Sequence, residues 1–280
     1  MIACIVHGPG APAEVVARAE HVLSDHGVGC WAAGRDEPGS GTAARLRKTN
    51  VVLTLGGDGT FLAGARLAAP RGIPLLGVNL GRLGFLTELE GDQLESGLVR
   101  FLEGRYRVEE RTMLQVQLIR GDRTVAKAIG LNEVVVNRAE EARMLRVEID
   151  VGGRGVGVID ADGVIVATAT GSTAYALATG GPILEPTLRD LLLVPVNPFA
   201  LTVRPIVFPP GQDLSLAVLR GPAEMRVDGG SRRRAVATGD VVRCGAHPRR
   251  LKTVRFGPAE DFYRRLGEKL GWGRPLVPMK

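Results

Sequence analysis

The sequence Val51-Val-Leu-Thr-Leu-Gly-Gly-Asp-Gly-Thr60 predicts a buried strand that runs through a glycine-rich turn into a helix. Leucine and β-branched residues fill its first half, as in a strand with both faces covered. The glycines allow positive φ angles and a close approach of the backbone to a ligand. Because N–H groups at a helix start favour phosphate, the stretch indicates a phosphate-binding turn. It is not a P-loop, since the Lys-Ser/Thr ending is absent.

Asp58 is the unusual residue of this turn. A carboxylate beside a phosphate repels it unless the carboxylate has a task, such as binding a metal ion or accepting the proton of an attacking hydroxyl. The alternative is structural, with Asp58 as the cap of a helix that follows a tight turn. The turn by itself leaves both interpretations open.

Outward from this turn, the first third of the chain alternates strand and helix patterns. Strands are expected at 2–6, 28–33, 51–55 and 73–78, and helices at 12–26, 58–69 and 92–102. Such alternation is typical of a parallel sheet flanked by helices.

After about Tyr106 the pattern changes to short alternating segments separated by Gly, Pro and Asp turns. Strands are expected at 114–119, 133–136, 145–151, 164–168, 191–194, 201–208 and 214–219, with one helix at 172–178. This pattern is typical of an all-β domain of the sandwich or barrel kind. A last helix, expected at 258–270, suits either domain by its pattern alone.

The predicted fold class is an α/β N-terminal domain with a parallel sheet, followed by a β-rich, sandwich-like C-terminal domain. We assign residues 1–110, completed by 258–280, to the first domain and residues 111–257 to the second.

Composition excludes several classes of protein. The 280 residues are 45% hydrophobic, which is ordinary for a globular protein. The net charge of +6 gives a basic surface that can attract nucleic acid, membranes or anionic small molecules. The three cysteines are far apart, so neither a disulfide framework nor a zinc site is expected. No signal peptide or membrane span is recognisable, and we expect a cytoplasmic protein. The two tight basic clusters, 232–234 and 249–250, are either solvated loop charge or help to hold a phosphorylated ligand.

Two further clusters carry chemistry. Asn132-Glu133 sets an amide beside a carboxylate, a pair that can read a ribose diol or a base edge, or can simply be polar residues at a strand edge. Thr170-Gly-Ser-Thr-Ala-Tyr175 places hydroxyls and glycine where a strand passes into a helix, after Asp162-Gly163. That arrangement suits ligand binding, and it equally suits a capped helix start.

Taken together, these motifs resemble the NAD kinase family, in its bacterial ATP- or polyphosphate-dependent form. The Gly-Gly-Asp-Gly piece alone is shared with lipid kinases and phosphofructokinases, but the order and spacing of the full set are far more specific. Further similarity lies in Asn79-Leu-Gly-Arg-Leu-Gly-Phe85, Gly180-Gly-Pro-Ile183, Leu201-Thr-Val-Arg-Pro-Ile-Val207, Asp228-Gly229 and the tail from Gly267 to Trp272.

The resemblance implies ATP-dependent phosphorylation of the 2′-hydroxyl of the adenosine ribose of NAD, giving NADP. It implies a site in a cleft between the two domains, a divalent metal ion, Mg²⁺ by preference, that comes with ATP, and no tightly bound cofactor. It also implies a homodimer or homotetramer. Membranes and nucleic acid are not expected as partners, because the sequence has no amphipathic basic helix and no aromatic residues interleaved with basic ones.

The resemblance also assigns residues. Asp58 would be the catalytic proton acceptor, Asn132 and Glu133 would hold the ribose, and Asp162 would lie near the nicotinamide. The other positions implied to bind NAD are Gly59, Phe85, Arg143, Asp160, Thr173, Ala174, Tyr175 and Ala178. The phosphate loop would comprise Gly56, Gly57, Gly59 and Thr60, and no residue is assigned to a metal.

Two departures leave details of substrate preference open: Pro198-Phe199 stands where relatives often have Pro-His, and Gly230 where some have Gln. The competing interpretations are a diacylglycerol-type lipid kinase and a non-catalytic nucleotide- or nucleic-acid-binding module. The sequence does not settle the use of NADH, the choice between ATP and polyphosphate, or feedback by NADPH.

Overall fold

The computed structural model describes residues 1–36, 41–81, 84–258 and 261–272. The chain divides into two compact units. Unit 1 comprises Met1–Phe61, Leu75–Glu109 and Thr253–Lys280, and unit 2 comprises Leu62–Pro74 and Glu110–Lys252. In the described part of the chain, no helix is long and apolar enough to cross a membrane.

The first sheet has seven strands in the order β2-β1-β3-β4-β18-β6, with β5 paired to β4. Its strands are β1 (Ile2–His7), β2 (Gly29–Gly34), β3 (Val51–Leu55), β4 (Pro74–Asn79), β5 (Leu89–Glu90), β6 (Arg107–Arg111) and β18 (Leu251–Arg255). β1 to β4 are mutually parallel where they pair, and Ala3 stands opposite Val51. The predicted parallel sheet is confirmed.

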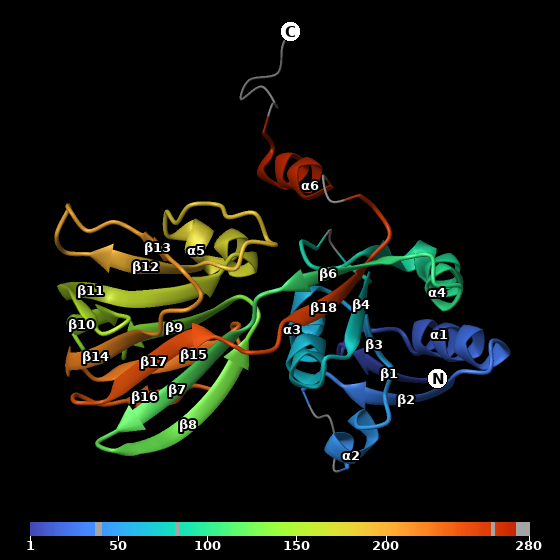
Figure 1. Ribbon diagram of the computed structural model, residues 1–280, viewed down its shortest axis with the longest axis horizontal. Helices are drawn as coiled ribbons and strands as arrows, with labels where there is room; N and C mark the ends of the chain where they lie inside the picture. The colour runs from blue at the N-terminus through green and yellow to red at the C-terminus, as the bar shows by residue number, and fades with distance from the viewer. Residues whose placement is uncertain (37–40, 82–83, 259–260, 273–280) are drawn as a thin grey trace, which may run out of the picture. The chain divides into compact units, whose positions relative to one another are not determined.

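Helices cover both faces of this sheet (Figure 1). α1 (Ala13–Asp25) and α4 (Leu94–Leu102) share one apolar core with alternate residues of the strands, such as Leu76 and Val78 of β4. Because successive strand residues point to opposite faces, Gly77 faces the other way. On that face, Gly77 packs against the ring of Phe61 in α3 (Asp58–Ala68). A Cβ on Gly77 would overlap this ring.

Shorter elements complete the list: α2 (Thr42–Leu46), α5 (Tyr175–Ala178), α6 (Asp261–Leu270) and the 3-10 turns η1 (Ala69–Arg71), η2 (Gly91–Gln93) and η3 (Thr170–Thr173). The helix predicted at 258–270 is therefore present as α6 from residue 261, while residues 259–260 lie outside the described chain.

The second sheet is a curled sheet of eleven strands whose printed pairs are antiparallel (Figure 1). Its order is β16-β15-β9-β11-β10-β14-β17-β7-β8, and β12 joins β11 to β13. The strands are β7 (Leu114–Arg120), β8 (Arg123–Gly130), β9 (Glu133–Arg138), β10 (Leu145–Val151), β11 (Arg154–Thr168), β12 (Leu191–Pro198), β13 (Ile206–Phe208), β14 (Leu214–Arg220), β15 (Ala223–Val227), β16 (Arg234–Val236) and β17 (Val241–Ala246).

Three strands of the second sheet are buried on both faces. Val134, Val166 and Leu193 of β9, β11 and β12 point into the large core on one face. Their neighbours Val135, Ile165 and Leu192 point into a smaller core on the other face, which Ala176 of α5 helps to close. Double burial explains why these strands read as continuous apolar runs rather than as alternating ones.

Two predicted elements differ from the structure. The helix expected at 172–178 is split into η3 and α5, because Ala174 between them has non-helical angles of φ −99° and ψ −129°. The strand expected at 201–208 begins only at Ile206. Pro205 precedes it, and proline cannot donate to a strand ladder. The sequence also missed strands rich in charge, among them β8 and β18.

Candidate functional site

The glycine-rich turn of unit 1 is packed around one buried side chain. Gly56 has φ +150°, and a Cβ there would collide with Thr60, which is 3% exposed. A Cβ on Gly8 would lie 2.8 Å from Thr60 Oγ1, so this hydroxyl occupies the space that the missing side chains leave. Gly57 and Gly59 are exposed at the start of α3. Gly56 and Thr60 thus shape the turn, while Gly57 and Gly59 are accessible to a ligand.

Asp58 is the first residue of α3, and its carboxylate is held by a different segment. Asp58 Oδ2 accepts a hydrogen bond from the N–H of Phe85 at 3.0 Å, and Oδ1 accepts one from the N–H of Leu86 at 3.2 Å. Gly84 leaves room for this arrangement, since a Cβ there would collide with the carboxylate. The capping alternative therefore does not describe the side chain, which remains partly exposed.

Phe85 lies against the C-terminal helix. Lys269 Nζ of α6 stands 3.9 Å from the centroid of the Phe85 ring. Burial lowers the pKa of Lys269, and the negative charge of Asp58 partly counteracts it. Lys269 was not among the predicted site residues, although the tail that carries it resembles the family. Arg82 and Leu83 of the predicted motif before Phe85 lie outside the described residues.

In unit 2, the segment that carries Asn132 and the segment that begins at Thr170 are in direct contact. A Cβ on Gly171 would stand within 2.8 Å of three backbone atoms of Asn132, so only glycine fits there. Thr168 ties the two segments together, because its hydroxyl donates to Leu131 O at 2.5 Å and accepts from the N–H of Gly171 at 3.1 Å. The structure thus brings together two motifs that are about forty positions apart in the sequence.

Asp228 holds the same segment from another side. Its carboxylate accepts hydrogen bonds from the N–H groups of Leu131, Asn132 and Glu133 at 3.0, 2.8 and 3.3 Å. Arg66 also donates to it, at 3.3 Å. The Asp228 side chain is fully buried, which raises its pKa, and its N–H partners and Arg66 oppose that shift.

Buried oxygens gather at this point. Within the described residues, Asn132 Oδ1, Glu133 Oε2 and Thr170 Oγ1 are buried and have no hydrogen-bond partner. Burial, with help from the charge of Asp228, raises the pKa of Glu133 to about 8, and the N–H of Tyr175 opposes the shift. Buried polar atoms nearly always have partners, so this cluster has the character of a binding site for a molecule with several hydroxyl or N–H donors.

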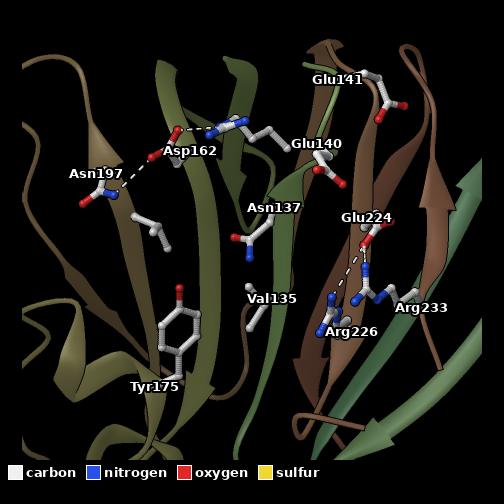
Figure 2. Close-up of a pocket in the computed structure, with 12 residues that line it drawn as sticks. Val135, Asn137, Glu140, Glu141, Asp162, Tyr175, Asn197, Glu224, Arg226 and Arg233 are labelled. Carbon is white, nitrogen blue, oxygen red and sulfur yellow. Dashed lines mark hydrogen bonds and ion pairs between the residues drawn. The ribbon is translucent and has the colours of Figure 1, made fainter. Parts of the chain in front are cut away.

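Unit 2 also has a cavity of about 510 Å³ (Figure 2). Two predicted site residues, Asp162 and Tyr175, line it. Asp162 accepts hydrogen bonds from Asn197 Nδ2 at 3.1 Å and Arg138 Nε at 2.7 Å, and both contacts lower its pKa. The remaining lining residues are Val135, Asn137, Glu140, Glu141, Val196, Glu224, Arg226 and Arg233.

The other predicted positions of unit 2 are distributed as follows. Thr173 at the end of η3 and Ala174 just before α5 are partly buried, and Ala178 is exposed at the end of α5. Asp160 accepts from Arg146 at 2.7 Å and Arg220 at 3.1 Å, which lowers its pKa. Arg143 is exposed and is not one of the residues that line the cavity. Ion pairing of Asp160 and the exposure of Arg143 are features that no local sequence pattern reveals.

No group of three or more His, Cys, Asp or Glu side chains that could hold a metal ion occurs in the ranges that the structure describes. Of the two basic clusters, Arg233 lines the cavity and pairs with Glu224 at 3.4 Å, and Arg250 pairs with Glu110.

Comparison with known proteins gives one consistent family. The ATP-NAD kinase N-terminal domain profile matches residues 17–106, and the C-terminal domain profile matches residues 131–256. An NAD kinase of Heliobacterium modesticaldum is 47% identical over 232 residues, 82% of this chain and 81% of that protein. One from Gemmatimonas aurantiaca is 41% identical over 228 residues, 80% of this chain and 78% of that protein.

Solved structures agree in fold. A yeast NADH kinase complexed with NADH matches with a TM-score of 0.87 at 23% identity, over 100% of this chain and 90% of that one. An Archaeoglobus fulgidus NAD kinase in complex with ATP matches with a TM-score of 0.77 at 27% identity, over 98% of this chain and 100% of that one.

Proposed function

The chain belongs to the NAD kinase family, and from this premise we propose that it transfers the terminal phosphoryl group of ATP to the 2′-hydroxyl of the adenosine ribose of NAD, giving NADP. The observation that carries the proposal beyond family membership is the buried cluster around Asn132 and Glu133. Their unpaired oxygens suit the two hydroxyl donors of a ribose. Nothing in the comparisons supports the lipid kinase alternative.

Asp58 is the proposed proton acceptor. Phosphoryl transfer passes through a loose transition state, so orientation of the attacking hydroxyl and charge neutralisation do most of the work. The two N–H contacts from Phe85 and Leu86 orient the Asp58 carboxylate, and its partial exposure leaves it accessible to a hydroxyl. Gly57 and Gly59 are exposed residues at the start of α3, where backbone N–H groups are suited to the donor phosphates.

A divalent ion, Mg²⁺ by preference, would neutralise the phosphates of ATP when bound. No cluster of carboxylate, imidazole or thiolate ligands for it exists among the described residues, so no side chain of this chain is assigned to the ion and no step depends on one.

The remaining contacts to NAD are proposed from the family pattern and the cavity. Tyr175 and Asp162, on the wall of a cavity of about 510 Å³, are proposed to bind the nicotinamide half of the molecule. Thr173, Ala174 and Ala178 are proposed to line the pocket beside them, and Phe85 to pack near the adenine. Arg143 and Asp160 stay predictions, and a role for Asp160 requires that it bind ligand while paired with two arginines.

The state of the protein in the cell is also a proposal. We expect a homodimer or homotetramer, by analogy with the family. We expect the cytoplasm because Cys4, Cys30 and Cys244 are free thiols, as is usual in a reducing compartment. Nucleic acid and membranes are not expected as partners.

The test is a panel of donors and acceptors. Purified protein is incubated with Mg²⁺, with ATP or inorganic polyphosphate as donor and NAD or NADH as acceptor, and NADP or NADPH is measured with an NADP-specific dehydrogenase. Formation of NADP from ATP and NAD is expected. Failure to form NADP or NADPH with any pair, by protein that is shown to be folded, would overturn the proposal.

A further inference from the structure

We propose that Arg255 and Arg265 are positioning residues for Asp58, acting through the segment 84–88 that lies between them. The proposal rests on the proposed function, because it takes Asp58 as the proton acceptor. All of the residues concerned belong to unit 1.

The orientation of Asp58 depends on backbone rather than on side chains. Its two carboxylate oxygens are bound by the N–H groups of Phe85 and Leu86, at 3.0 and 3.2 Å. The position of the Asp58 carboxylate is therefore fixed only as firmly as the backbone that donates to it. Gly84 adds a steric limit, because the Asp58 carboxylate fills the space where its Cβ would be.

Two arginines also bind the backbone of this segment. Arg255 Nη1 of β18 donates to the carbonyl of Leu86 at 3.2 Å, and Arg265 Nη1 of α6 donates to the carbonyl of Thr87 at 2.9 Å. Leu86 therefore presents its N–H to Asp58 and its carbonyl to Arg255. The peptide groups that follow the Asp58 contacts are thus prevented from rotating.

The carboxylate of Glu88 binds both arginines. Glu88 Oε2 accepts from Arg255 Nη1 at 3.0 Å and from Arg265 Nη2 at 3.2 Å. Its other oxygen accepts from the N–H groups of Phe256 and Gly257, at 2.6 and 3.2 Å. Arg255 Nε also donates to Glu109 Oε1 at 3.3 Å.

This network is shielded from water. The side chains of Arg255, Glu88 and Glu109 are 7%, 6% and 8% exposed. A buried ionic network of this kind is weak support for net stability, because desolvation of the charges offsets their attraction. A fully satisfied network does hold its members in one geometry, and catalysis is sensitive to displacements of about 1 Å. Positioning is therefore the role that the contacts support.

Arg265→Met is the decisive variant, because Arg265 lies on α6 with its side chain 19% exposed and its loss leaves Arg255 in place. We expect kcat to fall about tenfold or more while KM for NAD and for ATP stays within about twofold, and Arg265→Lys to recover part of kcat. Arg255→Met should show the same pattern, more strongly, if it folds. In an Asp58→Asn background, the residual rate should fall no further on adding Arg265→Met.

Arg18→Met is the matched control. Arg18 of α1 pairs with Glu95 of α4 at 2.8 Å in the same unit, and neither residue belongs to this network or to segment 84–88. The variant removes an arginine ion pair of unit 1 and should leave kcat unchanged. Unchanged kcat in Arg265→Met, a rise in KM instead, or an equal loss in the Asp58→Asn background would overturn the positioning role. Absence of NADP formation by the unaltered protein would overturn the proposed function instead.

Discussion

The carboxylate of Asp228 accepts a hydrogen bond from the backbone N–H of Asn132 at 2.8 Å, although the two residues are 96 positions apart. The same carboxylate accepts from the N–H groups of Leu131 and Glu133, at 3.0 and 3.3 Å. Asp228 itself sits at φ +51°, which is uncommon for a residue other than glycine. The proposed ribose-binding pair is therefore placed by a buried acid that need not touch the ligand.

Replacement of this acid by its amide should loosen the proposed ribose site. In Asp228→Asn, one carboxylate oxygen becomes an NH₂ donor that faces either the N–H of Leu131 or those of Asn132 and Glu133. We expect a loss of about 1–3 kcal/mol in the free energy of unfolding, together with weaker NAD binding. Urea denaturation and calorimetric titration with NAD measure the two effects. Asp240→Asn is the control, since Asp240 is a buried acid paired with Arg120 in the same unit, and it should lose stability without losing NAD affinity.

Addition of one methyl group at Gly171 should separate the two motifs of unit 2. The new Cβ in Gly171→Ala would overlap backbone atoms of Asn132, so either segment must move. We expect destabilisation of about 1–3 kcal/mol and a raised KM for NAD. Gly155→Ala, where nothing lies within 4 Å of the new atom, is the control and should behave like the unaltered protein. Unchanged stability and KM in Gly171→Ala would contradict the close contact.

Removal of the negative charge of Asp58 should remove most of the turnover while the protein still folds. Asparagine keeps one oxygen for one of the two N–H groups of Phe85 and Leu86, its NH₂ group faces the other, and it cannot accept a proton. We expect kcat to fall about 10²- to 10⁴-fold, with NAD binding little changed and a smaller loss of stability than in Asp228→Asn, because Asp58 is partly exposed. Steady-state rates, NAD titration and thermal unfolding are measured on the same preparation. Turnover at the level of the unaltered protein would remove Asp58 from its proposed role.

The raised pKa of Glu133 should make the free energy of unfolding decrease as the pH rises from about 4.5 to about 8. Its pKa is about 8 in the folded chain, against an ordinary value of 4.5, so between these limits the folded state holds a proton that the unfolded state releases. The free energy of unfolding therefore decreases with rising pH across this window, by up to about 1.4 kcal/mol per unit from this group. Its contribution is fully present below pH 4.5 and is lost as the pH passes 8.

Glu133→Gln imitates the protonated acid at every pH. The variant should gain stability relative to the unaltered protein as the pH is raised from 5 to 8, the range set by the two pKa values of Glu133. Urea denaturation at several pH values measures the difference. Glu148→Gln, on an exposed position of β10, controls for the general loss of one negative charge. A difference that does not vary with pH would show that Glu133 is charged in the folded protein.

Much of the fold follows from local patterns. β3, the turn and α3 lie within residues 51–68, and their apolar spacing and glycine chemistry act over a few residues only. The same holds for the strands of the second sheet whose apolar residues face a core. Strands such as β8 and β18 were missed because they carry charged residues at positions where an apolar pattern is expected.

The same distinction between local pattern and tertiary contact applies to the predicted site residues. Family motifs indicated Asn132, Glu133 and Gly171 by their order in the chain, and the contact between Asn132 and Gly171 appears only in the folded chain. The family pattern indicated Asp160 as a position that contacts ligand, and the structure adds that two arginines from β10 and β14 pair with it. Which charges are neutralised inside the protein depends on strand pairing, and that pairing joins residues up to 60 positions apart.

The sequence by itself determined the fold class, the glycine-rich turn with Asp58, and the family to which its motifs belong, because each of these is written in short-range spacing and residue type. Only the tertiary structure decided what holds Asp58 and Asn132 in place. Backbone N–H groups 27 and 28 residues away bind the first, and a buried carboxylate 96 residues away binds the second. Such contacts depend on which segments the core brings together. Every residue except proline has a backbone N–H group, so residue types do not show which of these groups will bind a carboxylate.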